Sequence, residues 1–461
     1  MTTEQIVGDV NEEPSLEADQ AYNQAQEEGA QELSPNLGEA SQYGATPPPI
    51  TNVKLAPLPC GIVLFDHPDE VGNGTAYLPE VPAQRVRSPN DLRNDVIWVS
   101  NLSAFEEKIQ THPTLRSGYY FRVMLADIAH DMGIQSTRDG QMHPDDAVKV
   151  ATIMTRTMTI AARAYGWDVA ELGPLRVQES FLMKDIAKML PMPPAPDPRF
   201  RDDLVRALTQ AYQDASIPDW PAPTYEPDSV YVTLRFNRVN YVQQLIECPM
   251  PAGRDWVRID NVDMDENTLQ FCVTHPTLVK ATIEWDNATN EMAALAAYGQ
   301  AGKKRNTMRL WLAQPELSWI SQHAKVTIST IWLDKSGYRR LPPPARLPGL
   351  FTAHPEACLS YSAGLVAYNH WQALASCTWN RRSRIEESSV WATWLRALDR
   401  AMMFSMALKA YEAGFHVERY GGGALRLRVT RDRLTELAQF KEKHGFMYPD
   451  INSLLHRHEL G

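Results

Sequence analysis

Cysteine is scarce in this sequence, and the five cysteines are scattered along the whole chain. No two of them are closer than 19 residues. This spacing excludes the CxxC pairs of zinc and redox sites, and it does not resemble a disulfide framework. We therefore expect free thiols in a reducing compartment. The five positions are Cys60, Cys248, Cys272, Cys358 and Cys377.

Long apolar runs are also lacking. No segment reaches the roughly 18 apolar residues that a membrane-spanning helix needs, and the N-terminus has neither the basic nor the apolar part of a signal peptide. The most apolar segment, 402–408, is followed by Lys409 and Glu412 and is better explained as a buried helix. The sequence predicts a soluble, cytoplasmic protein without a membrane partner.

Basic residues are missing from the first 53 positions, where ten acidic residues occur before Lys54. Removing those ten charges from the total of −11 leaves a body of charge −1. Such a polar, acidic segment buries too little apolar surface to offset its ordering entropy. We predict a disordered acidic tail over 1–53. Because an acidic arm repels phosphate, this tail is not expected to bind nucleic acid as a basic arm does.

Recognisable catalytic signatures are absent, including GxSxG, HExxH and the kinase set. An acidic stretch around Asp263 and Asp265 begins like a calcium loop, but Thr268 and Thr274 stand where that loop requires Gly and Glu. We assign no catalytic residue, no cofactor and no metal ligand, and an enzymatic role is uncertain and disfavoured. If the chain is an enzyme of unfamiliar family, His370 is the first residue to inspect.

The order of the expected elements is helices, then strands, then helices. We predict a mainly helical region over 54–220, a strand-rich region over 221–350, and a helical C-terminal region over 351–461 that packs on the body. This order favours an α+β fold, with helix-rich N- and C-terminal parts around a sheet-rich middle.

Several segments carry clear local signals. Pro144 followed by two acids predicts the start of a helix that runs to Tyr165. Alternation predicts strands at 230–236, 256–259, 268–273, 281–285, 308–312 and 326–333. A helix is expected over 386–414. Three glycines at 421–423 then predict a turn into a strand at 425–429, and their backbone amides could bind an anion.

Basic residues form four clusters in the nearly neutral body. If the clusters share one face, they could contact nucleic acid. The candidate contact residues are Lys303, Lys304, Arg305, Arg339, Arg340, Arg381, Arg382 and Arg384, and the fourth cluster is Arg426, Arg428, Arg431 and Arg433.

The chain is rich in tryptophan (12) and methionine (17), which suit large contact surfaces. In length and layout it resembles the capsid proteins of small double-stranded RNA viruses of the partitivirus-like group. This resemblance implies a self-assembling structural protein built from dimers, a flexible N-terminal segment, a place in the virion, and weak contact with RNA. The alternatives are a nucleic-acid-binding accessory protein that uses its arginine clusters, and an enzyme of unfamiliar family.

Overall fold

The computed structural model describes residues 60–101 except 68–71, 94 and 95, then 141–165, 198–212, 228–285, 307–340, 357–377 and 387–449, with a few isolated positions between them. The chain divides into two units, Met1–Thr51 and Asn52–Gly461. Every described residue belongs to the second unit, so the predicted acidic tail lies outside the described residues.

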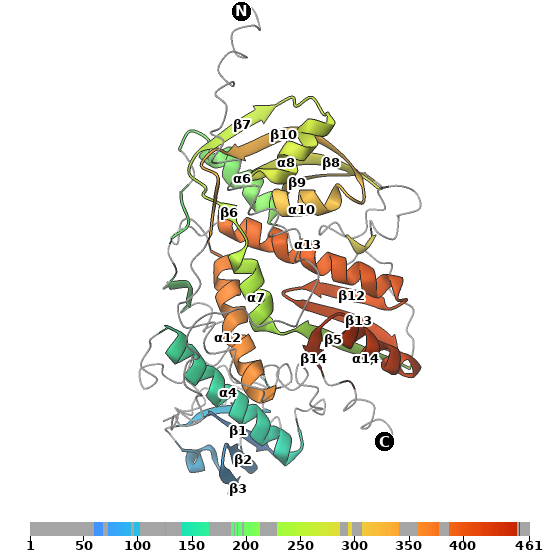
Figure 1. The fold of residues 1–461 in the computed structure, drawn as a ribbon. Coiled ribbons are helices and arrows are strands. Elements are labelled where there is room, and N and C mark those ends of the chain that lie inside the picture. The colour runs from blue at the N-terminus through green and yellow to red at the C-terminus, as the bar shows by residue number, and fades with distance from the viewer. Residues whose placement is uncertain are drawn as a thin grey trace, which may run out of the picture. The chain divides into compact units, whose positions relative to one another are not determined.

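The first sheet has the strand order β3-β2-β1-β4 and contains one parallel pair, β1 with β4. Strands β1, β2 and β3 are labelled in Figure 1. Because side chains alternate along a strand, β1 contributes to two apolar clusters. Ile62 and Leu64 pack with α4, whereas Val63 and Phe65 pack with Trp98 of β4. The strands are β1 (Cys60–Phe65), β2 (Gly74–Leu78), β3 (Val81–Val86) and β4 (Ile97–Ser100).

Helix α4 (Pro144–Tyr165) begins and ends where the sequence predicts. Pro144, Asp145 and Asp146 form its first turn, where a missing N–H and negative charge are both tolerated. The helix packs on β1 and β2, and Thr155 Oγ1 accepts a hydrogen bond from the Cys60 amide at 2.9 Å. It also packs against α12, which links the first sheet to the rest of the unit.

The second sheet has the order β7-β10-β8-β9, and all of its pairings are antiparallel. Helices α8 and α10 pack against β8, and α6 packs against β9. The elements are α6 (Arg201–Ala211), β7 (Trp256–Asp260), α8 (Glu266–Thr274), β8 (Thr277–Glu284), β9 (Thr307–Ala313), α10 (Gln314–Ile320) and β10 (Lys325–Asp334).

The strand expected at 268–273 is wrong, because this segment lies within helix α8. The Asp265 side chain accepts a hydrogen bond from the Thr268 amide at 2.6 Å and so caps the helix. This cap also accounts for the calcium-like acidic stretch, because one of its carboxylates satisfies a helix N-terminus.

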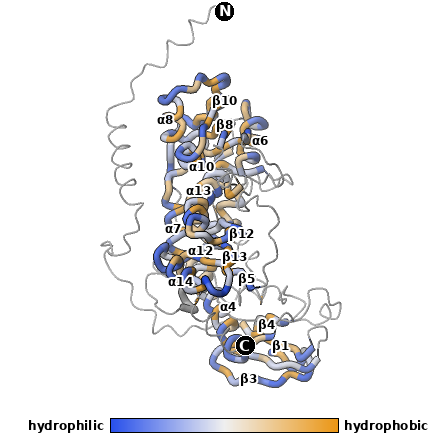
Figure 2. Tube along the Cα trace, turned by 90° about the vertical axis from the view of Figure 1, so that its right-hand side faces the viewer, coloured by the Kyte–Doolittle hydropathy of each residue, from blue (hydrophilic) through white to orange (hydrophobic). Residues whose placement is uncertain are grey.

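The third sheet has the order β12-β13-β5-β14 and joins distant parts of the sequence. Strand β5 lies in the predicted strand-rich region, while its neighbours β13 and β14 lie in the C-terminal region, so one sheet spans both regions. Figure 2 shows hydrophobic and hydrophilic positions next to each other along β12, β13 and β5. They are β5 (Ser229–Phe236), β12 (His416–Gly421), β13 (Ala424–Thr430) and β14 (Phe446–Tyr448).

Helices α12 and α13 connect the sheets (Figure 1). Helix α13 packs against α6, α10 and the β12–β13 hairpin, while α12 packs against α4, α7 and α13. The buried Arg400 of α13 binds both carboxylate oxygens of Glu316 of α10, at 2.6 and 2.7 Å. The remaining elements are α7 (Arg238–Glu247), β6 (Met250–Pro251), β11 (Tyr338–Arg339), α12 (Ala357–Ala375), α13 (Val390–Glu412) and α14 (Leu434–Lys443).

The α+β class is confirmed, since helices and several mostly antiparallel sheets make up the described unit. The sequence missed α7 and α10, and it missed strands β2 and β3 in the first region. It placed the strand after the triple glycine correctly, since β13 follows Gly421–Gly423.

Candidate functional site

The outward face of the third sheet brings basic side chains together. Strand alternation leaves the inward positions of β13 buried and its outward positions more open to solvent. On the outward face, Arg426 of β13 lies opposite Arg419 of β12 on one side and opposite Thr233 of β5 on the other. Arg428, two residues further along β13, lies opposite Tyr231 of β5. We call Arg419, Arg426, Arg428 and Tyr231 the arginine face.

The contacts within the arginine face fix its geometry. The Arg426 guanidinium lies over the Tyr231 ring, 5.1 Å from the ring centre, yet 47% of Tyr231 is exposed. Arg419 and Arg426 are both exposed. Arg428 is more enclosed and faces Glu418, with 3.7 Å between Nε and Oε1, and His416 Nε2 lies 3.3 Å from the same carboxylate oxygen.

The charge balance of this face is positive. Among the described residues of β12, β13 and β5, Glu418 is the one acidic side chain, against the three arginines of the face and Arg235. Two arginines placed directly opposite each other on neighbouring strands repel one another.

The triple glycine does not act as an anion site for an external ligand. The amides of Gly422 and Gly423 donate to the two carboxylate oxygens of Asp399, at 2.8 and 3.3 Å, and the Tyr241 hydroxyl donates to the same carboxylate at 2.7 Å. Desolvation by burial raises the pKa of Asp399. The anion predicted from the glycines is therefore a side chain of this protein, and it holds the β12–β13 turn against α13.

The glycines at this turn are required by both conformation and space. Gly422 and Gly423 have φ values of +60° and +69°, which L side chains adopt at a cost. A Cβ at Gly422 would lie 2.9 Å from the Tyr368 hydroxyl, and one at Gly423 would lie 2.8 Å from the Tyr241 ring. This close fit sets the position of the hairpin that carries Arg419 and Arg426.

The basic residues singled out in the sequence do not all meet on one face. The Arg339 guanidinium stacks on Trp391 in the first turn of α13, at 4.7 Å, and Arg340 is exposed next to it. The hairpin lies against a later part of α13, where Phe404 meets Tyr420. The other six candidates, Lys303, Lys304, Arg305, Arg381, Arg382 and Arg384, lie outside the described residues.

The fourth basic cluster is split by the structure. Arg433 donates to the backbone carbonyls of Gly414 and Ala413, at 2.6 and 2.9 Å, and it also binds Glu436. It therefore holds the end of α13, whereas Arg426 and Arg428 belong to the sheet face. Sequence analysis missed Tyr231 and Arg419. The alternation in 230–236 was the available signal for Tyr231, since it places that residue on the polar side of the strand.

His370 is buried on α12, and its Nδ1 lies 3.0 Å from the Tyr165 hydroxyl. The two rings are stacked, with centres 6.1 Å apart. Desolvation lowers the pKa of His370 to about 4. This residue is enclosed in the packing between α12 and α4, so we assign it a structural role.

We predict that His370 makes the fold acid-sensitive. Its pKa is about 4 in the folded state against 6.5 when unfolded, so the unfolded chain takes up the proton first. The stability contribution is complete above pH 6.5 and falls by about 3 kcal/mol as the pH drops from 6.5 to 4. Urea unfolding from pH 7.5 to 4 checks this, with His370→Gln as the control. An equally steep loss in the variant would contradict it.

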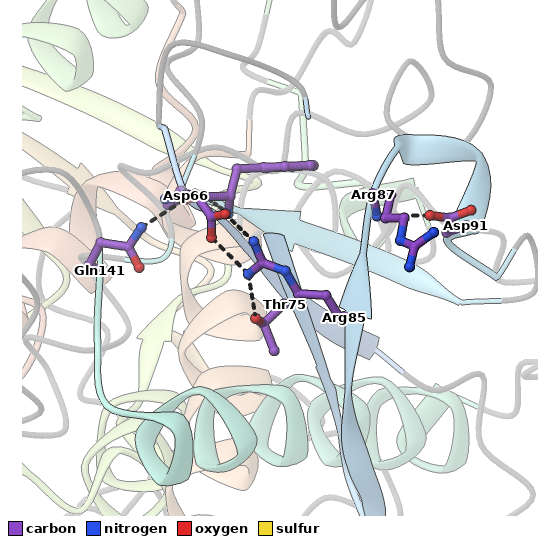
Figure 3. Close-up of polar contacts among 8 residues, drawn as sticks. Asp66, Thr75, Arg85, Arg87, Asp91 and Gln141 are labelled. Atoms are coloured by element: carbon purple, nitrogen blue, oxygen red, sulfur yellow. Dashed lines mark hydrogen bonds and ion pairs between the residues drawn. The ribbon is translucent and has the colours of Figure 1, made fainter. Parts of the chain in front are cut away.

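Polar residues also meet at the end of β1 (Figure 3). Arg85 of β3 binds both carboxylate oxygens of Asp66 and holds the pKa of that carboxyl below its usual value. Gln141 donates to the Phe65 carbonyl at 2.7 Å, and Asn101 bonds to both the amide and the carbonyl of Phe65. These contacts give hydrogen-bond partners to the backbone groups at the end of β1, and Asp66 is paired with the Arg85 guanidinium.

The cysteines do not form a reactive site in the described part of the chain. Among the described side chains, Cys60, Cys248, Cys272 and Cys377 form no disulfide bonds. Burial raises the pKa of Cys60 and of Cys272 to about 12, which keeps these thiols protonated.

Within the described ranges, no three His, Cys, Asp or Glu side chains gather closely enough to hold a metal ion. No helix in that part of the chain is both long and apolar enough to cross a bilayer.

No protein-family model matches this chain, and no curated protein sequence matches it. Solved structures of the phi29 DNA polymerase resemble it weakly. The ternary complex with primer-template DNA and incoming nucleotides gives a TM-score of 0.38 at 9% identity. The post-translocation binary complex with primer-template DNA gives 0.40 at 11%. In each case 80% of this chain and 80% of that chain are covered. A likeness at this level carries no argument about activity.

The prediction of a viral capsid subunit, with its self-assembling and virion roles, is wrong on this comparison. The two solved structures named above are complexes of a DNA polymerase and not shell subunits. The physical basis of the error lies in the tryptophans. Trp98, Trp332, Trp371, Trp391 and Trp394 are fully buried within this one chain, so these five tryptophans belong to its own core and not to a subunit contact. Dimer formation stays a prediction.

Proposed function

We propose that this protein binds nucleic acid through the arginine face. One observation carries the proposal: three arginines and an exposed tyrosine lie next to one another on the outward side of a single sheet. Nucleic-acid interfaces combine cationic side chains, which contact phosphates, with aromatic rings, which contact bases. The chain as a whole carries −11, so a local positive face would orient a polyanion that the rest of the molecule repels.

The arginine face also has a rigid support, as a binding site requires. Its strands are paired along most of their length, and the hairpin turn is fixed by the bonds from Gly422, Gly423 and Tyr241 to Asp399. Arg428 is further oriented by Glu418. The backbone of the face therefore does not need to be ordered when a ligand binds.

We expect Arg426→Ala to weaken binding of a fluorescent 20-nucleotide strand by roughly 3- to 10-fold and to reduce the salt slope by about 1, since one phosphate contact is removed. Fluorescence anisotropy between 50 and 200 mM salt measures both. If the two exposed arginines, Arg419 and Arg426, contact phosphates, wild-type affinity falls roughly 7-fold over that range.

Arg206→Ala is the matched control. Arg206 is an exposed arginine of helix α6, which packs against the second sheet, and it lies near Asp203. Its removal changes the net charge by the same amount, so it is expected to leave affinity within about 1.5-fold of wild type. Equal effects of the two variants would reduce the proposal to a net-charge effect. Arg340→Ala tests one of the residues singled out from the sequence. If it weakens oligonucleotide binding more than Arg426→Ala does, the binding site lies next to β11 and not on the arginine face.

A further inference from the structure

We infer that the nucleic acid taken up by the arginine face is single-stranded, with a base stacked on the Tyr231 ring. This inference rests on the proposed function and narrows its ligand class. Tyr231 is the most exposed large hydrophobic side chain among the described residues, at 47%. A half-exposed ring beside the arginines of β13 is an apolar surface where a planar ligand group would fit.

The position of Tyr231 in the sheet supports stacking. The ring projects from β5, and Arg428 lies directly opposite it on β13. Arg426, the diagonal neighbour, places its guanidinium over the ring at 5.1 Å. On the same strand the next outward residue is Thr233, whose side chain is too small to cover a neighbouring aromatic ring. The tyrosine is therefore held by its strand and by its contact with Arg426, with part of its surface left to solvent.

Duplex and single-stranded nucleic acids offer different groups to a protein surface. In a duplex the bases are stacked on each other, so a protein surface meets chiefly phosphates and groove edges. In a single strand the base faces are accessible, and aromatic side chains displayed on a sheet stack on them while arginines follow the backbone. An exposed ring beside two arginines of the neighbouring strand suits single-strand binding, whereas arginines alone would suit duplex binding.

The experiment compares Tyr231→Ala and Tyr231→Phe with wild-type protein, on full-length chain. Three fluorescent probes are used: a 20-nucleotide oligo(dT), an oligo(rU) of the same length, and a 20-base-pair DNA duplex. We expect Tyr231→Ala to weaken single-strand binding by roughly 5- to 150-fold, the range for loss of one stacked base. Tyr231→Phe keeps the ring and is expected to remain within about 2-fold. Duplex binding should change less than 2-fold in both variants.

The measurement with the duplex probe distinguishes base stacking on Tyr231 from a role in which Tyr231 only positions Arg426. If Tyr231 only held Arg426 in place, Tyr231→Ala would weaken single-strand and duplex binding by the same factor, and the inference would be overturned while the proposed function stood. If Arg426→Ala left all three probes unaffected, the proposed function itself would fail. Binding of oligo(dT) and oligo(rU) within about 3-fold of each other is expected, because a ring and a guanidinium do not read the 2′-hydroxyl. Binding confined to the duplex would overturn the single-strand assignment.

Discussion

Arg400→Met is expected to lower the free energy of unfolding by about 3–5 kcal/mol, because it leaves a buried carboxylate without its cation. Arg400 and Glu316 are both almost fully buried, and the guanidinium also donates to the Ala211 carbonyl at 2.7 Å. These bonds join α13, α10 and α6. Desolvation raises the pKa of Glu316, as expected for a carboxylate enclosed by protein. Urea unfolding followed by circular dichroism measures the loss.

The double variant Arg400→Met with Glu316→Leu is the control. Replacing both members of a buried ion pair with apolar residues of similar volume is often neutral or stabilising. We therefore expect the double variant to recover more than half of the loss. A double variant less stable than Arg400→Met alone would show that the pair itself, and not the unpaired carboxylate, decides the stability at this position.

Asp399→Ala is expected to destabilise the protein by about 3–5 kcal/mol. The substitution leaves three buried donors unpaired, the Tyr241 hydroxyl and the amides of Gly422 and Gly423, and each unpaired donor costs about 1–3 kcal/mol. Because these bonds fix the hairpin, nucleic-acid affinity should fall as well. Thermal unfolding and anisotropy on the same preparation measure the two effects.

Tyr241→Phe is expected to destabilise the protein less than Asp399→Ala does. It removes one of the three donors and keeps the ring that packs against Gly423, so we expect a loss of about 1–2 kcal/mol. The order of stability should be wild type, Tyr241→Phe, Asp399→Ala. An Asp399→Ala protein that loses less than 1 kcal/mol would show that the turn holds its shape without the carboxylate.

Local signals in the sequence predicted elements that are determined locally. Pro144 with two acids is enough to start a helix, and the glycines at 421–423 are enough to end one strand and begin another. At 268–273 the two local signals competed. The alternating pattern favoured a strand, while Asp265 three residues before Thr268 is a helix cap, and the cap prevailed.

The site could be predicted in its parts but not in its assembly. Alternation along 230–236 puts Tyr231 and Thr233 on one side of a strand, and the same reasoning applies to Arg426 and Arg428. Their meeting depends on the pairing of β5 with β13, two segments almost two hundred residues apart. No short-range pattern encodes which strand pairs with which, because that choice is made by the packing of the whole core.

The most direct test of nucleic-acid binding at the arginine face is photo-crosslinking of wild-type protein to a single-stranded oligonucleotide, with the crosslinked peptides identified by mass spectrometry. The account predicts crosslinks in the peptides that contain Tyr231 of β5 and Arg426 of β13, and their loss in Tyr231→Ala protein. Crosslinks confined to the peptide with Arg339 and Arg340, or a protein that neither crosslinks to nor binds the oligonucleotide at 50 mM salt, would contradict it.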